Sequence, residues 1–297
     1  MSIKESFNRI TITTLRKHKK ESRKITALTA YDYSTAKFLD EAGIDIILVG
    51  DSLAMVALGH ESTHAVTMDE MIHHTKAVTR GAKRALVIAD MPFMSYQIDE
   101  KTAACNAGRF IKEAGATAVK LEGGSKQIIN TIQRLTEAGI PVLGHLGFTP
   151  QFLHTLGGYS IQGKNLESTG KIMDQACAIQ EAGAFGIVLE MVPEESAKLI
   201  TENIDIPTIG IGAGRFCSGQ ILVTDDILGK YSDFTPKFAR KYTDLASIIK
   251  QAVIQYKEDV LTGSFPAESE IFKLSEEERM RLENNFNYAE SLNSEKD

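Results

Sequence analysis

Several kinds of residue that mark particular protein classes are scarce in this sequence of 297 residues. It contains no tryptophan, and its three cysteines lie far apart without C-x-x-C spacing, so neither a disulfide framework nor a zinc knuckle is expected. No apolar run approaches the ~20 residues that span a bilayer, and no apolar segment of a signal peptide follows the basic N-terminus. We therefore expect no membrane association and a cytoplasmic location.

Positively charged residues are fewer than negatively charged ones. The chain has 33 Lys and Arg against 39 Asp and Glu, a formal net charge of −6, which gives no electrostatic attraction toward nucleic acid. The hydrophobic content of 43% is enough for a large core, and the charged fraction of 24% argues against a disordered chain. We expect a globular protein that binds any anionic substrate through local positive charge.

A Glu-Ala-Gly tripeptide recurs four times and ends at Gly43, Gly115, Gly139 and Gly183. An amphipathic segment precedes each copy and an apolar run of strand length follows it. Each glycine is therefore predicted to end a helix in the left-handed conformation and to lead the chain into a strand.

Eight nearly continuous apolar runs predict parallel strands that are buried on both faces. They cover residues 25–29, 44–49, 85–89, 116–121, 141–144, 186–189, 208–211 and 221–223. Helical patterns lie between them, and this alternation predicts the α/β class and a single-domain (β/α)₈ TIM barrel. A doubly wound sheet is the competing architecture, but no G-x-G-x-x-G follows the first strand.

The two ends of the chain are predicted to be helical additions to the barrel. We expect residues 1–273 to form the barrel domain, including a short basic N-terminal helix that covers the barrel bottom. Residues 274–297 are expected to be a peripheral helix and flexible acidic tail, which begins with a capping box of Ser275 and Glu278.

Polar side chains end five consecutive predicted strands, from the second to the sixth. They are Asp51, Asp90, Lys120, Glu122, His145 and Glu190. The carboxyl ends of barrel strands form the rim where barrel enzymes carry their active sites. Lys120 and Glu122 are two residues apart, so the alternation of a strand directs both toward the same side.

Three of these side chains, Asp51, Asp90 and Glu122, are carboxylates that would repel one another without a cation. An all-oxygen ligand set favours Mg²⁺ over Zn²⁺, although Mn²⁺ and Co²⁺ also accept oxygen ligands. For any one of them, the alternative is a cap on the following helix or loop.

The remaining polar residues have two interpretations each. Lys120 could bind a substrate carboxylate or form a salt bridge with a neighbouring acid. Ser52 could hydrogen-bond the same anion or cap the local backbone. His145 could donate to the substrate, lie next to the metal, or be a rim histidine with a structural partner.

Glu190 lies among apolar neighbours, between Val188-Leu189 and Met191-Val192. Such surroundings raise the pKa of a carboxyl toward neutrality, which suits a general base that removes a proton from carbon. The alternative is a cap for the helix that follows Pro193. The glycine-rich segment 210–214 is predicted to be a phosphate cradle, a site of close backbone packing or part of a pterin-sized pocket.

These residues lie in segments that closely resemble the ketopantoate hydroxymethyltransferase family. The matching segments, in order, are Thr29-Ala30-Tyr31-Asp32-Tyr33, Leu48-Val49-Gly50-Asp51-Ser52, Ala89-Asp90-Met91-Pro92-Phe93, Val119-Lys120-Leu121-Glu122-Gly123-Gly124, Gly144-His145-Leu146-Gly147, Thr149-Pro150-Gln151, Gly157-Gly158-Tyr159, Gln162-Gly163 and Ile209-Gly210-Ile211-Gly212-Ala213-Gly214. They run over roughly residues 10 to 270, and the tail from about Lys273 exceeds the usual family length.

The resemblance implies transfer of a hydroxymethyl group from 5,10-methylenetetrahydrofolate to 3-methyl-2-oxobutanoate, the first step of pantothenate biosynthesis. It implies one Mg²⁺ per subunit, held by Asp51, Asp90 and Glu122 directly or through water. It also implies contacts of Ser52, Asp90 and Lys120 with the oxoacid, Glu190 as proton acceptor, and a homo-oligomer, commonly a decamer.

Two other functions remain possible from the sequence. A barrel of the phosphoenolpyruvate mutase or isocitrate lyase type also binds Mg²⁺ and 2-oxoacid-like ligands at this rim. Those enzymes normally use a reactive cysteine or a phosphonate site, whereas Cys105, Cys177 and Cys217 lie outside the predicted strand ends. A metal-binding barrel that only recruits a partner would need no base.

Overall fold

A computed structural model describes residues 9–230 and 236–294, with side chains up to residue 285. It divides the chain into two compact units, Met1–Asp244 and Leu245–Asp297. The first unit holds the whole barrel. The boundary thus falls before the position expected from the sequence, between residues 273 and 274.

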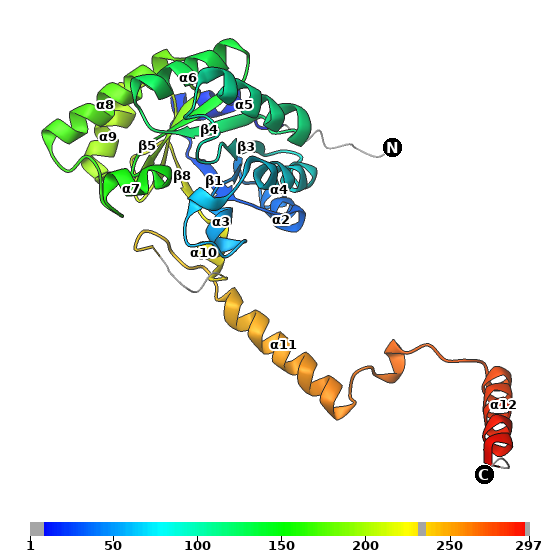
Figure 1. Cartoon of the computed structure of the whole chain (residues 1–297). Coiled ribbons are helices and arrows are strands. Elements are labelled where there is room, and N and C mark those ends of the chain that lie inside the picture. The colour runs from blue at the N-terminus through cyan, green and yellow to red at the C-terminus, as the bar shows by residue number, and fades with distance from the viewer. Residues whose placement is uncertain (1–8, 231–235, 295–297) are drawn as a thin grey trace, which may run out of the picture. The chain divides into compact units, whose positions relative to one another are not determined.

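The first unit is a closed barrel of eight parallel strands that follow one another in chain order (Figure 1). The strands are β1 (Ile25–Thr29), β2 (Ile46–Val49), β3 (Leu86–Asp90), β4 (Ala118–Glu122), β5 (Val142–Gly147), β6 (Gly186–Glu190), β7 (Thr208–Ile211) and β8 (Gly219–Leu222). The eight predicted strands and the TIM barrel are confirmed. Closure between β8 and β1 rules out a doubly wound sheet.

Helices surround this barrel and continue into the second unit. They are α1 (Ile12–Lys20), α2 (Tyr33–Glu41), α3 (Leu53–Val56), η1 (Thr63–Ala65), α4 (Met68–Gly81), α5 (Glu100–Ala114), α6 (Lys126–Glu137), η2 (Pro150–Phe152), α7 (Leu153–Leu156), α8 (Leu166–Glu181), α9 (Glu194–Asn203), α10 (Thr224–Leu228), α11 (Leu245–Thr262), η3 (Glu268–Glu270) and α12 (Glu276–Ser294).

The four repeated glycines have the predicted conformation. Their φ angles are +84° at Gly43, +72° at Gly115, +81° at Gly139 and +92° at Gly183. This left-handed region strains residues that carry a Cβ, so glycine ends each helix at low cost and turns the chain toward the next strand. The repeat therefore fixes where β2, β4, β5 and β6 begin.

Two apolar layers hold the barrel together. An outer layer lies between strands and helices and includes Val49, Phe110 and Leu189. An inner layer fills the barrel itself, with residues such as Ile88 and Leu143. Burial of both strand faces explains why these strands are continuously apolar in sequence.

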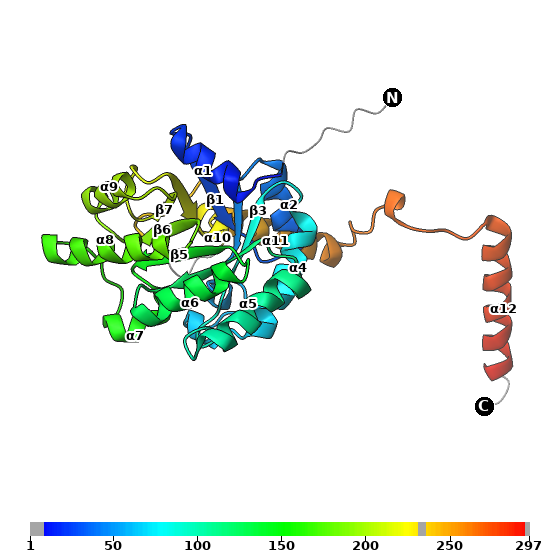
Figure 2. The same cartoon turned by 90° about the horizontal axis from the view of Figure 1, so that it is seen from above.

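Helix α1 contributes to the inner layer, as expected for a helix at the barrel bottom. Leu15 of this helix is buried with the barrel interior. The Nζ atom of Lys19 donates to the carbonyl oxygens of Thr201, Ile204 and Ile206 at 3.0, 2.5 and 2.8 Å, in the segment that leads into β7. Figure 2 shows α1 beside β1.

Helix α10 carries two buried acids, and they differ in their partners. Asp225 pairs with Lys230 at 3.1 Å. Burial, together with the charge of Asp225, raises the pKa of Asp226 to about 6 in spite of Lys241. An acid whose pKa is higher in the folded state than in the unfolded state is destabilising when ionised, fully so above the folded pKa.

We therefore expect Asp226→Asn to stabilise the protein at pH 8, by up to about 3 kcal/mol. The gain should shrink as the pH falls from about 6 toward about 4, because Asp226 is then protonated in the wild-type fold. Thermal unfolding at several pH values measures this gain. An equal gain at pH 4 and pH 8 would exclude this explanation.

The second unit contains α11 and α12. The predicted capping box is present in part, since the backbone N of Glu278 donates to Ser275 Oγ at 3.3 Å, and the predicted helix follows it. Residues 295–297 of the expected tail lie outside the described residues. Among the described residues, no helix has the length and apolarity needed to cross a membrane.

Candidate active site

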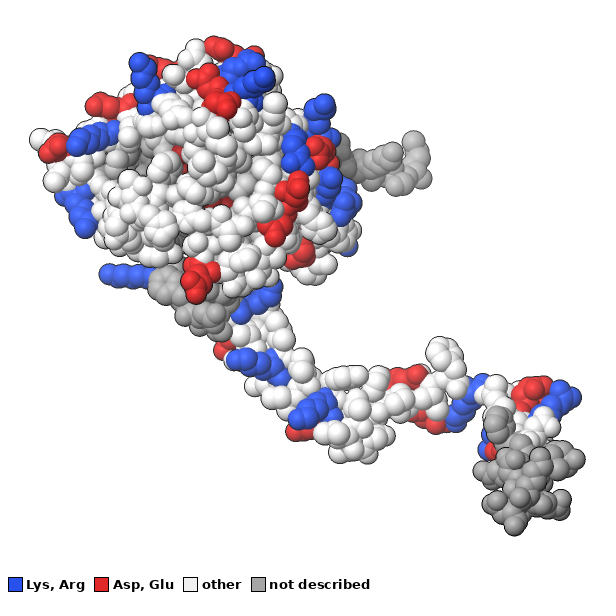
Figure 3. Space-filling model, in the orientation of Figure 1, with Lys and Arg blue, Asp and Glu red and all other residues white. Residues whose placement is uncertain are grey.

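The charges that matter for the site are inside the barrel. On the visible face of the barrel, charged side chains lie mainly around the edge, and the centre is largely uncharged (Figure 3). Within the barrel, the inward positions of β3 and β4 change from apolar to polar toward the carboxyl end. Strand β3 has Leu86 and Ile88 in the inner layer and then Asp90, and β4 has Ala118 and then Lys120 and Glu122.

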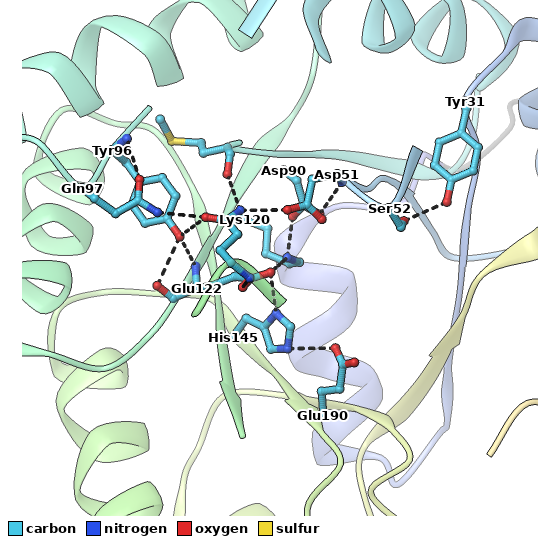
Figure 4. A network of polar contacts seen from close by, with 12 residues as sticks. Tyr31, Asp51, Ser52, Asp90, Tyr96, Gln97, Lys120, Glu122, His145 and Glu190 are labelled. Atoms are coloured by element: carbon cyan, nitrogen blue, oxygen red, sulfur yellow. Dashed lines mark hydrogen bonds and ion pairs between the residues drawn. The ribbon is translucent and has the colours of Figure 1, made fainter. Parts of the chain in front are cut away.

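The parallel register places these polar residues side by side. Asp90 of β3 pairs with Lys120 of β4, and Glu122 pairs with His145 of β5. Lys120 Nζ lies 2.6 Å from Asp90 Oδ1 and 3.4 Å from Glu122 Oε1, and all three side chains are buried (Figure 4). In this structure Lys120 thus forms salt bridges with neighbouring acids, as one of its two interpretations predicts.

His145 lies between two acids. Its Nδ1 is 3.4 Å from Glu122 Oε1, and its Nε2 is 3.2 Å from Glu190 Oε2. These are ion-pair contacts, because neither ring nitrogen makes an aligned hydrogen bond. The imidazole therefore connects the buried cluster to Glu190, whose side chain is 15% exposed.

Asp51 and Ser52 come from the turn after β2. The backbone N of Asp51 donates to Asp90 Oδ2 at 3.0 Å, which brings the second acid against the first. Ser52 begins α3 but makes no side-chain capping bond, and its Oγ lies 2.9 Å from the hydroxyl of Tyr31. The capping interpretation of Ser52 is therefore wrong.

The backbone around Glu190 is held by close packing. The backbone N of Phe148 donates to the Glu190 carbonyl oxygen at 2.8 Å, and a Cβ at Gly147 would lie only 2.2 Å from that oxygen. Gly147 also has a φ of +91°. The capping alternative is not seen, since the residue that precedes α9 as its N-cap is Pro193.

Burial and mutual repulsion raise the pKa values of Asp51 and Asp90. Burial raises the pKa of Asp51 well above its usual range, and Asp90 and Glu122 add to the rise. Burial also raises the pKa of Asp90, although Lys120 opposes this. Both carboxylates are therefore poorly neutralised by the protein alone.

The other charged groups are matched by partners of opposite sign. Burial alone would raise the pKa of Glu122, but Lys120 and His145 outweigh it and lower that pKa to about 2. For Lys120, the three acids outweigh burial and raise its pKa. For His145, Glu122 and Glu190 outweigh burial and the charge of Lys120 and raise its pKa to about 9. The raised pKa favours the protonated form of the imidazole at neutral pH.

A cavity of about 120 Å³ opens over this cluster. A water needs about 10–15 Å³ measured in this way, so the cavity has room for a small organic molecule. The polar residues on its wall are Asp51, Ser52, Asp90, Lys120, Glu122, His145 and Glu190, and Leu48, Val188 and Ile221 are among the apolar ones. All the site residues expected from the sequence line this one cavity.

The three predicted metal ligands are close but not arranged as a finished site. Among the described residues, no group of three or more His, Cys, Asp or Glu side chains could hold a metal ion as it stands. The chemistry nevertheless fits a hard cation, because the donors are all carboxylates and burial disfavours the charge of Asp51. Asp90 Oδ1, which faces Lys120, also makes no aligned hydrogen bond with a described residue.

Sequence reasoning missed three buried side chains that support the site. Tyr31 contacts Ser52, and Tyr96 and Gln151 contact the metal-ligand candidates. Tyr31 and Gln151 lie inside segments of family resemblance but were given no role there. No pattern of charge or periodicity marks Tyr96.

The glycine-rich segment after β7 serves close packing. A Cβ at Gly212 would lie 2.8 Å from the ring of Phe238, and a Cβ at Gly214 would lie 2.5 Å from the side chain of Glu194. This observation favours the packing interpretation over a phosphate cradle.

Comparison with known sequences identifies the family. A family model described as ketopantoate hydroxymethyltransferase matches residues 9–268. The chain therefore belongs to the ketopantoate hydroxymethyltransferase family. This confirms the resemblance seen in the sequence, and the matched range ends close to where the tail was predicted to exceed the usual family length.

Curated members of the ketopantoate hydroxymethyltransferase family match nearly the whole chain. The 3-methyl-2-oxobutanoate hydroxymethyltransferase of Syntrophomonas wolfei is 54% identical over 274 residues, which are 92% of this chain and 99% of that protein. The enzyme of the same name from Enterococcus faecalis is 54% identical and covers 90% of this chain and 97% of its own length. Membership in an enzyme family makes a purely partner-recruiting barrel the weaker hypothesis.

Solved structures share the barrel at low sequence identity. A 2,3-dimethylmalate lyase of the PEP mutase/isocitrate lyase superfamily has a TM-score of 0.58 and 15% identity, and the match covers 96% of this chain and 98% of that one. A phosphonopyruvate hydrolase in complex with oxalate and Mg²⁺ has a TM-score of 0.56 and 13% identity, covering 94% and 98%. At these identities the likeness shows the fold alone.

Proposed function

We propose that this chain transfers a hydroxymethyl group from 5,10-methylenetetrahydrofolate to 3-methyl-2-oxobutanoate, giving 2-dehydropantoate and tetrahydrofolate. The family membership supports the reaction class. The observation that carries the mechanism is the cavity that brings Glu190 to the same wall as a buried Lys120 and three carboxylates.

The proposed base is Glu190. Its carboxylate faces the cavity and contacts His145, whose pKa is raised by Glu122 and Glu190 in spite of burial. In this role Glu190 takes the proton from C3 of the oxoacid, and the carbanionic carbon then forms a bond to the one-carbon unit of the folate. Water supplies the oxygen of the new hydroxymethyl group, and the bonds from the one-carbon unit to the folate nitrogens break, which releases tetrahydrofolate. His145 holds the Glu190 carboxylate in place through the 3.2 Å contact.

The proposed substrate contacts are Asp51, Ser52, Asp90, Lys120 and His145. Lys120 is the buried cation nearest the acids and supplies positive charge for the substrate carboxylate. Asp51, Asp90 and Glu122 would hold Mg²⁺, which supplies electron withdrawal from the keto group when it is bound. Nearby apolar residues, including Val188 and Ile221, leave room for the isopropyl group.

The direct test is product formation. Purified protein with Mg²⁺, methylenetetrahydrofolate and 3-methyl-2-oxobutanoate should yield 2-dehydropantoate, detected by mass spectrometry. Turnover should require all three additions. Metal-loaded protein that gives no product would overturn the proposal, and activity only with a phosphonate substrate would favour the phosphoenolpyruvate mutase type.

A homo-oligomer, commonly a decamer in this resemblance, is also part of the proposal. Helix α11 supports it because it has no buried residue, and Ile248, Val253 and Leu261 are exposed. Exposed apolar residues in such number usually mark a protein interface. Sedimentation of the full chain gives the subunit number, and a monomer at micromolar concentration would contradict it.

A further inference from the structure

Gln151, in η2 after β5, lies at the centre of a buried network of hydrogen bonds. Its side chain is buried, and its Oε1 accepts from the Tyr96 hydroxyl at 2.8 Å and from Gln97 Nε2 at 2.9 Å. The Tyr96 oxygen in turn accepts the backbone N of Glu122 at 3.0 Å. The hydroxyl also faces the Glu122 carbonyl oxygen at 3.3 Å, and its shorter distance to Gln151 Oε1 favours donation to Gln151.

These contacts determine which way the Gln151 amide faces. Because Oε1 meets two donors, the NH₂ group must point to the opposite side. There it donates to Asp51 Oδ2 at 2.9 Å and to the carbonyl oxygen of Met91 at 2.9 Å. Both amide protons and both acceptor positions are thus in use, and the amide has one satisfied orientation.

The backbone of the same residue holds a second acid. The Gln151 backbone N donates to Glu122 Oε2 at 3.0 Å. One residue therefore binds one oxygen of Asp51 and one oxygen of Glu122. Glu122 Oε1 is left facing Lys120 and His145.

The buried carboxylates lower the stability of the fold, and the barrel architecture alone does not require them. The three buried carboxylates repel one another, and a fold that needed only stability would place apolar groups there. Neutral donors aimed at Asp51 Oδ2 and Glu122 Oε2 restrict these carboxylates to fixed rotamers, in which Glu122 Oε1 faces Lys120 and His145. Such outer partners of metal ligands commonly control metal affinity.

We infer that Gln151, oriented by Tyr96 and Gln97, is a positioning residue that holds Asp51 and Glu122 ready for the divalent cation. The inference rests on the proposed function, because it assumes that a divalent cation binds between these acids. Gln151 acts through the two carboxylates.

The experiment is a Mn²⁺ titration of the full chain without substrate, with free Mn²⁺ followed by electron paramagnetic resonance. Gln151→Met keeps the volume and the backbone donor but removes the amide. We expect its Kd for Mn²⁺ to rise about 10- to 100-fold. Tyr96→Phe removes the group that orients the amide and should change Kd in the same direction by a smaller factor.

Gln180→Met is the matched control. The Gln180 side chain also anchors backbone, accepting from Asp205 and Ile206 at 2.6 and 3.2 Å, but at the other end of the barrel. A general loss of stability would weaken Mn²⁺ binding in Gln151→Met and Gln180→Met alike. The inference instead requires that Gln180→Met keep the wild-type Kd for Mn²⁺. The rise in melting temperature on adding Mn²⁺ should likewise shrink only in the Gln151 and Tyr96 variants.

The outcomes separate this inference from the proposed function. If the wild type binds Mn²⁺ and Gln151→Met binds it equally well, Gln151 has no positioning role and the proposed function stands. If the wild type binds no Mn²⁺, the metal part of the proposed function fails and this inference fails with it. If Gln151→Met does not fold, Tyr96→Phe decides, and an unchanged Kd in that variant overturns the inference.

Discussion

Replacement of Glu190 by glutamine is expected to slow solvent-hydrogen exchange at C3 of 3-methyl-2-oxobutanoate by about 10²- to 10⁴-fold, the usual contribution of a positioned base. Glutamine has the same shape but cannot accept the proton. The substrate should still bind, because Lys120 and Ser52 remain on the cavity wall. Loss of the C3 proton signal in D₂O, followed by nuclear magnetic resonance, measures the exchange.

Glu194→Gln is the control for this substitution. Glu194 lies in the first turn of α9 and binds Arg215, so it tests the loss of a nearby carboxylate outside the cavity. Its exchange rate should equal that of the wild type. Exchange at the wild-type rate in Glu190→Gln would remove Glu190 from the role of base.

Asp51→Asn is expected to have opposite effects on metal affinity and on stability. Loss of a charged ligand should weaken Mg²⁺ binding by about 100-fold or more, since changes in the outer partners of ligands alone cost 10–100-fold. The metal-free protein should become more stable at neutral pH, because burial and neighbouring acids raise the pKa of Asp51 and disfavour its charged form in the fold.

Two measurements on the same samples check this prediction. Activity against Mg²⁺ concentration gives the metal requirement, and thermal unfolding in a chelator gives the stability of the metal-free protein. Asp45→Asn is the control, because Asp45 is a buried acid paired with Arg84 at 3.1 Å, away from the cavity. Unchanged metal dependence in Asp51→Asn would exclude Asp51 from the coordination shell.

A weaker metal affinity together with a higher stability in Asp51→Asn would identify Asp51 as a residue kept for function. A residue kept for stability alone does not make the fold more stable when it is neutralised. Acids that repel inside a barrel are expected where function requires their charge, and stability is then lower than the fold could achieve. For Asp226, which lies outside the wall of the cavity, only the change in stability is expected and not the change in metal affinity.

Much of the barrel follows from short-range patterns in the sequence. The four Glu-Ala-Gly joints and the apolar runs locate the strands to within a few residues, because a left-handed glycine and double-sided burial leave clear local signals. The strand bounds differ mainly at their ends, where Asp90, Glu122 and Glu190 prove to be the last residues of their strands.

The boundary of the second unit was less predictable. Residues 245–262 form a helix of the second unit, whereas the sequence predicts them as part of the barrel domain. Apolar periodicity shows that a helix buries one face, but it does not specify which part of the chain, or which other chain, covers that face.

The candidate site likewise has one part that the sequence predicts and one part that it does not. The sequence determined that Asp90, Lys120, Glu122, His145 and Glu190 share one rim, because parallel strands in chain order bring their carboxyl ends together. Only the tertiary structure decided that Lys120 pairs with Asp90 and that Gln151 reaches Asp51 across 100 residues of sequence. Strand periodicity is a local property of the backbone, whereas contacts between loops depend on how the closed barrel places them.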